Sequence, residues 1–421
     1  MPASGIFFFS FYMLCDILFP EVNHLKQIIS IMVLLLLLSG CQHTGPQEQT
    51  TVPEKIVTQA PPETTITTHP PSVPVHTEET TASTVPGFDP QALIDSMTLE
   101  ELVGQIFLAR CPEVNAAEDI AKYHLGGYVL FGRDFQNASP DSIREKLLSF
   151  QEAAVTPILI AVDEEGGTVT RISSFPQFRE RPFPSPRALY DAGGMELVLS
   201  TEAEKCLLLK SLGINVNLAP VCDITTDPSA FMYSRSLGQS AAITGVFAAE
   251  LCDLMAQQQI GSVLKHFPGY GNNTDTHTGI ATDPRSLEVL ESSDLIPFRS
   301  GIASGCDAIL VSHTIVSCLD PSMPASLSPE VIRYLRKKLG FQGVIVTDDL
   351  VMEAITELFG PGESAVLAVL AGNDLLCSSE YQVQYAAVLE AAISGRIPRE
   401  QLESSVARVL HWKYKLGLLI A

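Results

Sequence analysis

The stretch Ile-Gly-Ser-Val-Leu-Lys-His-Phe-Pro-Gly-Tyr-Gly-Asn-Asn-Thr-Asp-Thr-His, residues 260–277, joins an apolar strand pattern to a polar loop. Its first residues, Ile260–Leu264, have the length and composition of a buried strand. The glycines and Pro268 that follow disfavour a continued strand or helix. We therefore expect a strand that ends in the charged pair Lys265 and His266 and then gives way to a loop.

The loop places Asp275 two residues before His277. At this spacing a carboxylate can orient an imidazole and hold a proton on it, which predicts a proton-transfer pair on a movable segment. A plainer interpretation also fits, in which Lys265 and His266 are a solvated strand end and Asp275 and His277 are turn residues. The stretch alone leaves both interpretations open.

Composition limits the class of protein. The chain has 421 residues, 46% of them apolar, which is enough for a large core. Barrels of the α/β type use about 250 residues as one unit. The 26 Lys and Arg residues stand against 48 Asp and Glu residues, a net charge of −22, which argues against a nucleic-acid partner because phosphates must be met by cations. The acidic surface favours neutral or cationic partners.

The first residues have the pattern of an export signal. An apolar run at 28–38 is shorter than the ~20 residues that cross a bilayer, follows Lys26, and precedes Leu38-Ser39-Gly40-Cys41. This resembles a bacterial lipoprotein signal, which implies acylation of Cys41 and a membrane-anchored protein on the extracytoplasmic face. The alternative is an uncleaved anchor helix. Residues 1–23 do not suit a basic n-region, so we expect translation to begin near Leu25.

We expect three regions: a signal peptide at 1–41, a tether at 42–87 and a catalytic domain at 88–421. The tether is rich in Thr and Pro and cannot bury enough apolar area to offset its ordering entropy, which predicts disorder. The cysteines beyond the leader are widely spaced without a C-x-x-C pair, so buried free thiols are expected rather than disulfides or a zinc site.

Short apolar runs alternate with helical patterns from Phe88 onward. Thr98 and Glu101 have capping-box spacing and predict the first helix start. Helix-length patterns recur at 195–212, 241–258 and 329–339. The expected strands are 105–109, 127–131, 157–162, 216–221, 260–265, 307–312, 343–347 and 374–377.

Eight buried runs with helical crossovers predict the α/β class and a parallel (β/α)8 barrel of the TIM type as a single catalytic domain. An open doubly wound sheet is the alternative, but no G-x-G-x-x-G motif follows the first strand.

Polar residues follow the expected strands. In such barrels, catalytic groups lie at the carboxyl ends of the strands, so these residues predict a single polar pocket. The strand-end residues, from the third strand to the seventh, are Asp163-Glu164-Glu165-Gly166-Gly167, Cys222-Asp223, Lys265-His266, Ser312-His313 and Thr347-Asp348-Asp349.

Asp348 is the candidate nucleophile because it directly follows an apolar strand that would fix its backbone. Either Asp348 or Asp349 could instead cap the next helix, and the two could divide the roles, with Asp348 inward and Asp349 as the cap. His313 could contact substrate or only close its strand.

Four further strand-end or loop residues combine donors and acceptors that suit the hydroxyls of one sugar, although each could be a structural ion-pair member. They are Asp163, Arg171, Lys265 and His266.

Together these motifs closely resemble glycoside hydrolase family 3, in the branch of β-N-acetylhexosaminidases that act on cell-wall amino sugars. The resemblance runs from about Phe88 to the end of the chain. It rests on Lys-His-Phe-Pro-Gly-x-Gly followed by Asp-x-His, Val-Asp-x-Glu-Gly-Gly before Arg171, Ser234-Arg235-Ser236, and Gly-Val-Ile-Val-Thr-Asp-Asp-Leu at 343–350. One departure is Tyr270, where many relatives have His.

The resemblance implies retaining, two-step hydrolysis in which Asp348 is the nucleophile and His277, held by Asp275, is the acid/base. A histidine replaces the second carboxylate of most retaining glycosidases. An imidazole with an ordinary pKa of about 6.5 can perform this role near neutral pH. The residues implied to bind the sugar are Asp163, Arg171, Arg235, Lys265 and His266. No metal or organic cofactor is implied.

We therefore expect an exported, monomeric exo-β-N-acetylglucosaminidase that trims peptidoglycan fragments or related N-acetylglucosamine-containing glycans. A β-glucosidase or a phosphorylase of the same family is the alternative enzyme. A sugar-binding lipoprotein is the non-enzymatic alternative, and a metal-dependent hydrolase using His266, His277 and His313 is disfavoured because no paired-histidine strand motif is present.

Overall fold

The computed structural model describes residues 87–225, 227–271, 279–356 and 358–420. The expectations for the signal peptide, Cys41, the translation start and the tether therefore lie outside the described residues, apart from the tether's last residue. Asp275 and His277 lie outside them as well.

Eight parallel strands form one sheet in the order β10-β1-β2-β3-β4-β5-β7-β9. A parallel bridge between Val346 and Leu375 joins the two ends of this order and closes the sheet into a barrel. The TIM-type prediction is confirmed, and the open doubly wound alternative is wrong. The strands are β1 Phe107–Arg110, β2 Gly127–Leu130, β3 Leu159–Val162, β4 Val216–Asn217, β5 Gly261–Phe267, β7 Ala308–Val311, β9 Val344–Thr347 and β10 Leu376–Ser378.

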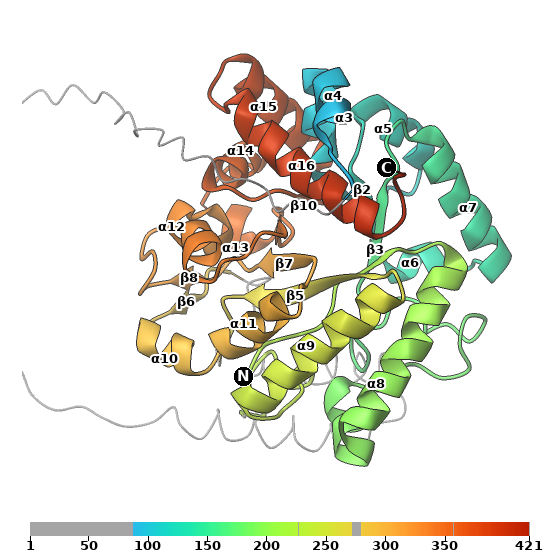
Figure 1. Cartoon of the computed structure of the whole chain (residues 1–421), viewed down its shortest axis with the longest axis vertical. Coiled ribbons are helices and arrows are strands. Elements are labelled where there is room, and N and C mark those ends of the chain that lie inside the picture. Colours follow the sequence, from blue (N-terminus) through green and yellow to red (C-terminus); the bar gives the residue numbers. More distant parts are fainter. Residues whose placement is uncertain (1–86, 226, 272–278, 357, 421) are drawn as a thin grey trace, which may run out of the picture. The chain divides into compact units, whose positions relative to one another are not determined.

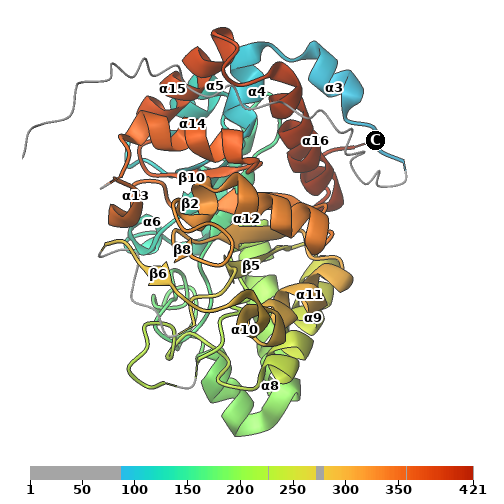
Figure 2. The same cartoon turned by 90° about the vertical axis from the view of Figure 1, so that its left-hand side faces the viewer.

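Helices surround the strands, as Figures 1 and 2 show from two sides. A separate two-stranded pair is formed by β6 Thr282–Asp283 and β8 Ile315–Val316. The helices are α3 Gln91–Ser96, α4 Leu99–Gln105, α5 Ala116–Tyr123, α6 Gly132–Phe135, α7 Pro140–Ala153, α8 Pro186–Leu212, α9 Ala241–Gln257, α10 Leu287–Ser292, α11 Leu295–Ala303, α12 Pro329–Arg333, α13 Glu353–Thr356, α14 Pro361–Ala371, α15 Tyr381–Ile393 and α16 Arg399–Lys415, with short turns η2 Ala325–Leu327 and η3 Tyr334–Lys338.

The predicted helix starts and lengths largely hold. Thr98 and Glu101 form the expected capping box at the start of α4, each side chain bonding the other residue's backbone N–H. The pattern at 195–212 is the later part of α8, whose regular geometry is interrupted at Gly193 and Gly194. The pattern at 329–339 divides into α12 and a π-helical turn.

The barrel interior is filled by apolar side chains from the strands and from α16. One buried cluster takes residues from strands all round the barrel, including Leu108, Val129 and Val344, together with Trp412 of α16 and Leu416, which directly follows that helix. A Cβ on Gly261 would lie 2.8 Å from the Trp412 ring, so glycine is needed where α16 packs beneath β5. The barrel interior is therefore a packed core and not a pore. Catalytic groups are expected at the carboxyl ends of the strands.

The described cysteines are free thiols, as predicted, and most of them are buried. Only Cys318 and Cys377 among them are partly exposed. In the same part of the chain, none of the helices combines the length and apolar character needed to cross a bilayer.

Candidate active site

A cavity of about 860 Å³ opens at the carboxyl ends of the barrel strands. This volume is in the range of small-molecule sites. Every described residue to which the sequence assigned a catalytic or sugar-binding role lines it: Asp163, Arg171, Arg235, Lys265, His266 and Asp348. The predicted single polar pocket is therefore present, while the roles of its residues stay predictions.

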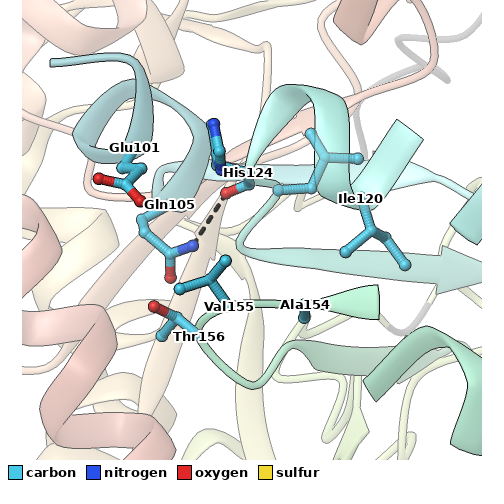
Figure 3. A pocket seen from close by; sticks show the side chains of 8 residues that line it. Glu101, Gln105, Ile120, His124, Ala154, Val155 and Thr156 are labelled. Atoms are coloured by element: carbon cyan, nitrogen blue, oxygen red, sulfur yellow. Dashed lines mark hydrogen bonds between the residues drawn. The ribbon is translucent and has the colours of Figure 1, made fainter. Parts of the chain in front are cut away.

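A second hollow, between α4, α5 and the segment before β3, is much smaller (Figure 3). It holds about 10 Å³, which is room for one water molecule and not for a sugar. Gln105 crosses this region and donates a hydrogen bond from Nε2 to the carbonyl of His124 at 2.9 Å (Figure 3).

Lys265, near the end of β5, is the centre of the polar wall of the large cavity. Its Nζ lies 2.6 Å from Asp163 Oδ1 and 2.6 Å from Glu165 Oε1. Burial alone would lower the pKa of Lys265, but the carboxylates of Asp163 and Glu165 outweigh it and raise that pKa. The ammonium group is therefore charged and fixed, with Asp163 at the cavity surface beside it.

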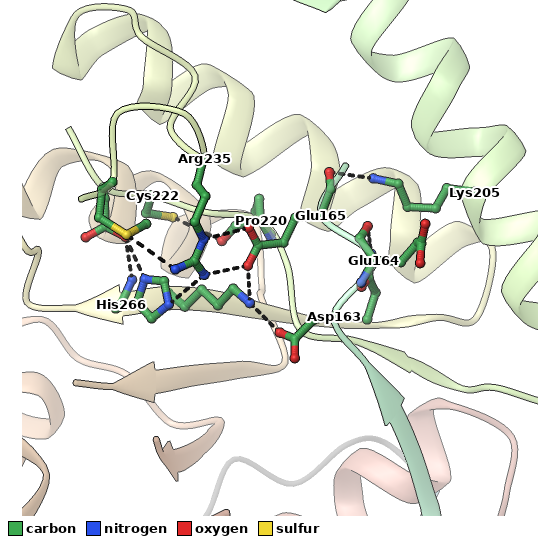
Figure 4. Close-up of polar contacts among 12 residues, drawn as sticks. Asp163, Glu164, Glu165, Lys205, Pro220, Cys222, Arg235 and His266 are labelled. Carbon is green, nitrogen blue, oxygen red and sulfur yellow. Dashed lines mark hydrogen bonds and ion pairs between the residues drawn. The ribbon is translucent and has the colours of Figure 1, made fainter. Parts of the chain in front are cut away.

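Glu165 connects Lys265 to Arg235. Arg235 binds it through two nitrogens, with Nε 3.0 Å from Oε2 and Nη2 2.7 Å from Oε1 (Figure 4). Burial raises the pKa of Glu165, but Lys265 and Arg235 more than reverse this and hold it well below its usual range. Glu165 is thus a buried anion that orients two cations toward the cavity.

His266 completes this wall. Arg235 Nη2 lies 3.2 Å from His266 Nε2, and because a guanidinium only donates, Nε2 accepts. The ring hydrogen is then on Nδ1, which lies 2.7 Å from Asp223 Oδ2. Asp223 also accepts the backbone N–H groups of His266 at 3.1 Å and Tyr270 at 2.8 Å, so one buried carboxylate fixes both the ring and the start of the loop.

Tyr270, the departure from the family pattern, packs in this wall. It is 1% exposed, and its ring stands edge-on to His266 with centroids 5.3 Å apart. It therefore limits the movement of the imidazole.

The loop that carries Arg171 is held by Glu164, which follows Asp163. The Glu164 carboxylate accepts the backbone N–H groups of Arg171 and Ile172, each at 2.8 Å. Asn217 of β4 in turn bonds the backbone of Glu164, with its Oδ1 accepting at 3.0 Å and its Nδ2 donating at 3.2 Å. Arg171 thus extends into the cavity from a fixed backbone.

Asp348 follows β9 and lines the cavity, as expected. Its backbone N–H donates to Val311 of β7 at 3.0 Å, and its Oδ1 accepts the N–H of Asp349 at 2.9 Å. The backbone that carries this carboxylate is therefore tied into the sheet on one side.

Asp349 does not cap the next helix, which was one of the roles that the sequence left open for it. Helix α13 begins only at Glu353, and the Asp349 carboxylate instead accepts the N–H of Ser379 at 3.0 Å and that of Val351 at 3.3 Å. It also binds the Ser379 hydroxyl. Asp349 therefore ties the loop after β9 to the segment after β10.

The sequence left open whether His313 contacts substrate or closes its strand. In the structure its side chain holds the segment after β7 in place. It is fully buried and absent from the cavity lining. Its Nε2 donates to the Asp349 carbonyl at 3.0 Å, so its Nδ1 accepts the Ser326 hydroxyl at 2.7 Å.

Arg285 contacts the chain on both sides of residues 272–278, and its Nη2 donates to the Gly269 carbonyl before them at 3.5 Å. Its Nη2 lies 2.7 Å from Asp283 Oδ2, and its Nη1 lies 2.8 Å from Asp294 Oδ2. A Cβ on Gly271, whose φ is +56°, would lie 2.7 Å from the same guanidinium. Residue 271 must therefore be glycine, because a side chain there would clash with Arg285.

The sequence interpretation gave no role to several residues of the site. Glu165 and Asp223 are buried behind the cavity wall; they were visible as strand-end acids, but their partners lie 70 and 43 residues away along the chain. Arg110 and Phe131 line the cavity, and each stands at the end of an apolar run that gave no chemical signal. Within the described ranges, no group of three His, Cys, Asp or Glu side chains is arranged to hold a metal ion.

Comparisons with known proteins identify the family of this chain. The family model "Glycosyl hydrolase family 3 N terminal domain" matches residues 98–412. A β-hexosaminidase of Stenotrophomonas maltophilia strain K279a is 33% identical over 296 residues, which cover 66% of this chain and 85% of the relative.

Two solved structures share the fold. A glycoside hydrolase family 3 β-N-acetylglucosaminidase from Paenibacillus sp. FPU-7 is 34% identical with a TM-score of 0.72, covering 77% of this chain and 64% of its own. LpqI of Mycobacterium tuberculosis is 27% identical with a TM-score of 0.71, covering 77% of this chain and 96% of its own.

Proposed function

Because the chain belongs to glycosyl hydrolase family 3, we propose that it is a retaining exo-β-N-acetylhexosaminidase that removes terminal N-acetylglucosamine from peptidoglycan fragments or related glycans. The names of its relatives, a β-hexosaminidase and a β-N-acetylglucosaminidase, support this substrate class. The observation that carries the proposal is one cavity that combines the charged wall around Lys265 with the carboxylate of Asp348.

The charged wall suits the outer hydroxyls of a terminal sugar. Each hydroxyl both donates and accepts, and the wall offers an acceptor in Asp163 beside the fixed cations Lys265 and Arg235. Hydrogen bonds to charged groups are about twice as strong as neutral ones. The sugar is thereby oriented before reaction, which is how binding energy lowers the barrier.

The reaction takes two steps. An Asp348 carboxylate oxygen forms a bond to the anomeric carbon as the bond to the leaving oxygen breaks, and His277 gives that oxygen its proton. Water then attacks the anomeric carbon of the glycosyl-enzyme, loses a proton to His277 and releases Asp348. Asp275 holds the imidazole in the required orientation. Two displacements at one carbon retain its configuration.

Turnover of a nitrophenyl β-N-acetylglucosaminide tests the proposal. We expect the purified chain to hydrolyse it, with or without a chelator, and to release N-acetylglucosamine. Preference for a nitrophenyl β-glucoside would indicate a β-glucosidase. A rate that depends on inorganic phosphate, with a sugar phosphate as product, would indicate a phosphorylase. Tight glycan binding without any turnover would indicate a sugar-binding protein.

The protein's location is part of the proposal. Its support is the apolar run at 28–38 and the Leu-Ser-Gly-Cys sequence that ends at Cys41. We expect the full chain to carry a fatty acid on Cys41 and to fractionate with membranes, with the catalytic domain on the extracytoplasmic side. Metabolic labelling with a radioactive fatty acid tests this, since a Cys41→Ala protein should be unlabelled. An equally labelled variant would contradict it.

A further inference from the structure

Lys205 of α8 is a buried cation to which neither the motifs nor the proposed mechanism gives a role. Its Nζ lies 2.7 Å from Oε2 of Glu202, three residues earlier on the same helix, and the two side chains are only 5% and 4% exposed. The same Nζ donates to the backbone carbonyl of Glu165 at 3.2 Å (Figure 4). The ion pair thereby joins α8 to the acid that binds both Lys265 and Arg235.

The Glu202–Lys205 pair supplies a hydrogen-bond donor more than it supplies stability. The attraction between two buried charges is largely offset by the cost of removing both from water, so an apolar pair of similar volume often stabilises a fold equally well. An apolar pair has no N–H group, however. What the ion pair adds at this place is therefore an ammonium group that Glu202 fixes beside the Glu165 carbonyl.

The carbonyl that Lys205 binds belongs to a peptide that can rotate. The next residue is Gly166, whose φ is +103°, and its N–H donates to the carbonyl of Val169 at 3.1 Å. The peptide between Glu165 and Gly166 is thus bound at its N–H by Val169 and at its carbonyl by Lys205. Because glycine tolerates many backbone conformations, loss of either contact would allow this peptide to turn. Such a turn would displace the Glu165 side chain.

Lys205 can influence a bound sugar only indirectly. Neither Lys205 nor Glu202 lines the large cavity. Both line a separate hollow behind Glu165 that holds about 20 Å³, which is room for one water molecule and not for a sugar. Any effect of the pair on substrate must therefore pass through Glu165.

We propose that Lys205, fixed by Glu202, is a positioning residue for the charged wall around Lys265 and acts through the backbone of Glu165. The Glu165 carboxylate lies 2.6 Å from Lys265 Nζ and 2.7 Å from Arg235 Nη2, so a shift of this acid displaces both cations. Loss of contacts made equally in the ground state and the transition state raises KM and leaves kcat unchanged. This inference rests on the proposed function and adds to it a pair of residues outside the cavity.

A paired variant, Glu202→Leu with Lys205→Met, removes the donor without leaving a buried charge behind. With a nitrophenyl β-N-acetylglucosaminide as substrate, we expect its KM to rise by about tenfold, the lower end of the effect of one charge-assisted hydrogen bond. Its kcat should stay within about threefold of the wild-type value. The single variant Glu202→Gln keeps the Lys205 nitrogen and an acceptor for it, so its KM should stay within about threefold as well.

Lys210→Met is the matched control. Lys210 lies on the same helix, and its Nζ also donates to a backbone carbonyl at 3.2 Å, that of Gln258. That carbonyl is not part of the charged wall, so the KM of Lys210→Met should equal that of the wild type. Circular dichroism and the unfolding midpoint establish that each variant is folded at the assay temperature.

A second background separates positioning from general stability. In Arg235→Met the contact between residue 235 and Glu165 is already lost, so the paired variant should lower kcat/KM there by about threefold or less instead of about tenfold. Independent sites contribute equal factors in both backgrounds. Equal factors would therefore overturn the inference.

Two further results would overturn it. One is a folded paired variant whose KM equals that of the wild type, and the other is a paired variant that loses kcat while KM is unchanged. A wild-type protein that cleaves no N-acetylglucosaminide would refute the proposed function instead, so the two failures are distinguishable.

Discussion

His266 and Asp223 are joined twice: the Asp223 Oδ2 atom accepts both the ring Nδ1–H of His266, at 2.7 Å, and its backbone N–H, at 3.1 Å. The two groups come from the ends of neighbouring strands, and the carboxylate is almost completely buried. The pair fixes the imidazole tautomer, so that Nε2 faces Arg235 as an acceptor. Asp223 is therefore a positioning residue for the sugar-binding wall.

Replacing Asp223 with Asn should weaken substrate binding more than chemistry. The amide keeps the shape of Asp223 but loses the negative charge that holds Nδ1–H. Loss of the carboxylate partner of a metal-bound histidine costs roughly 10- to 100-fold, and we expect an effect at the lower end of that range here. We expect KM for the nitrophenyl glycoside to rise by about tenfold while kcat stays within about threefold. Steady-state kinetics measure both. An unchanged KM with a collapsed kcat would show that Asp223 acts on the chemical step instead.

Glu165→Gln should destabilise the fold, because it leaves Lys265 and Arg235 buried with less negative charge. Removing one member of a buried ionic network costs about 3–5 kcal/mol. Urea unfolding at pH 7 measures the difference. Glu204→Gln is the control, since Glu204 pairs with Arg179 in a largely exposed position and should cost far less.

The loss of stability caused by Glu165→Gln should depend on pH. The pKa of folded Glu165 lies below its ordinary value of 4.5, so its ionisation stabilises the native protein at pH values above that. As pH falls below about 4.5, the unfolded chain takes up a proton first and this stabilisation declines. The stability gap between wild type and Glu165→Gln should therefore narrow under acid. A gap that is constant from pH 7 to pH 3 would contradict the account.

Lys413 should make stability increase with pH. It lies fully buried in α16, where its Nζ donates to Gln105 Oε1 at 2.7 Å, and burial lowers its pKa to about 7. The unfolded chain, with an ordinary pKa of 10.5, therefore binds more protons between pH 7 and pH 10. Stability contributed by this site then rises with pH by up to about 1.4 kcal/mol per unit.

Urea unfolding at pH 7, 8 and 9 measures this effect against Lys413→Met, which should lack it. Lys338→Met, at an exposed position, should keep the wild-type dependence. Equal pH dependence in wild type and Lys413→Met would show that the ammonium group is not the cause.

Asp348 and Asp349 are adjacent, but their substitution by Asn should have different effects on activity and stability. Asp348→Asn removes the proposed nucleophile and should reduce kcat by about 10⁴-fold or more with little change in the unfolding midpoint. Asp349→Asn weakens the contacts to Ser379 and Val351 and should lower the unfolding midpoint while leaving measurable turnover. Normal activity in Asp348→Asn would exclude the proposed nucleophile.

Local patterns in the sequence were sufficient to predict the barrel, because each strand is a short apolar run bounded by turn or helix signals. The errors lie at strand ends. The run at 216–221 continues past β4, but only Val216 and Asn217 are strand, since Pro220 has no N–H to give to the sheet. The run at 105–109 starts within α4 and its cap, so β1 begins at Phe107.

The site was only partly predictable. Asp163, Lys265 and Asp348 could be named because each stands at the end of a strand and so lies at the one rim of the barrel. The pairing of Glu165 with Lys265 and Arg235 depends on side-chain directions across different strands, which no local pattern contains. Arg110 escaped notice for a related reason, since only the fold brings it over Phe131.

Trapping the glycosyl-enzyme tests the central claim most directly. The enzyme is incubated with a 5-fluoro-N-acetylglucosaminyl fluoride. Its ring fluorine slows both steps, but its good leaving group accelerates the first, so the glycosyl-enzyme accumulates and can be digested and analysed by mass spectrometry. We predict an added mass of one fluorinated sugar on the peptide that contains Asp348, absent from Asp348→Asn. The same adduct on a different residue, or turnover of nitrophenyl substrate with inversion at the anomeric carbon, would contradict the account.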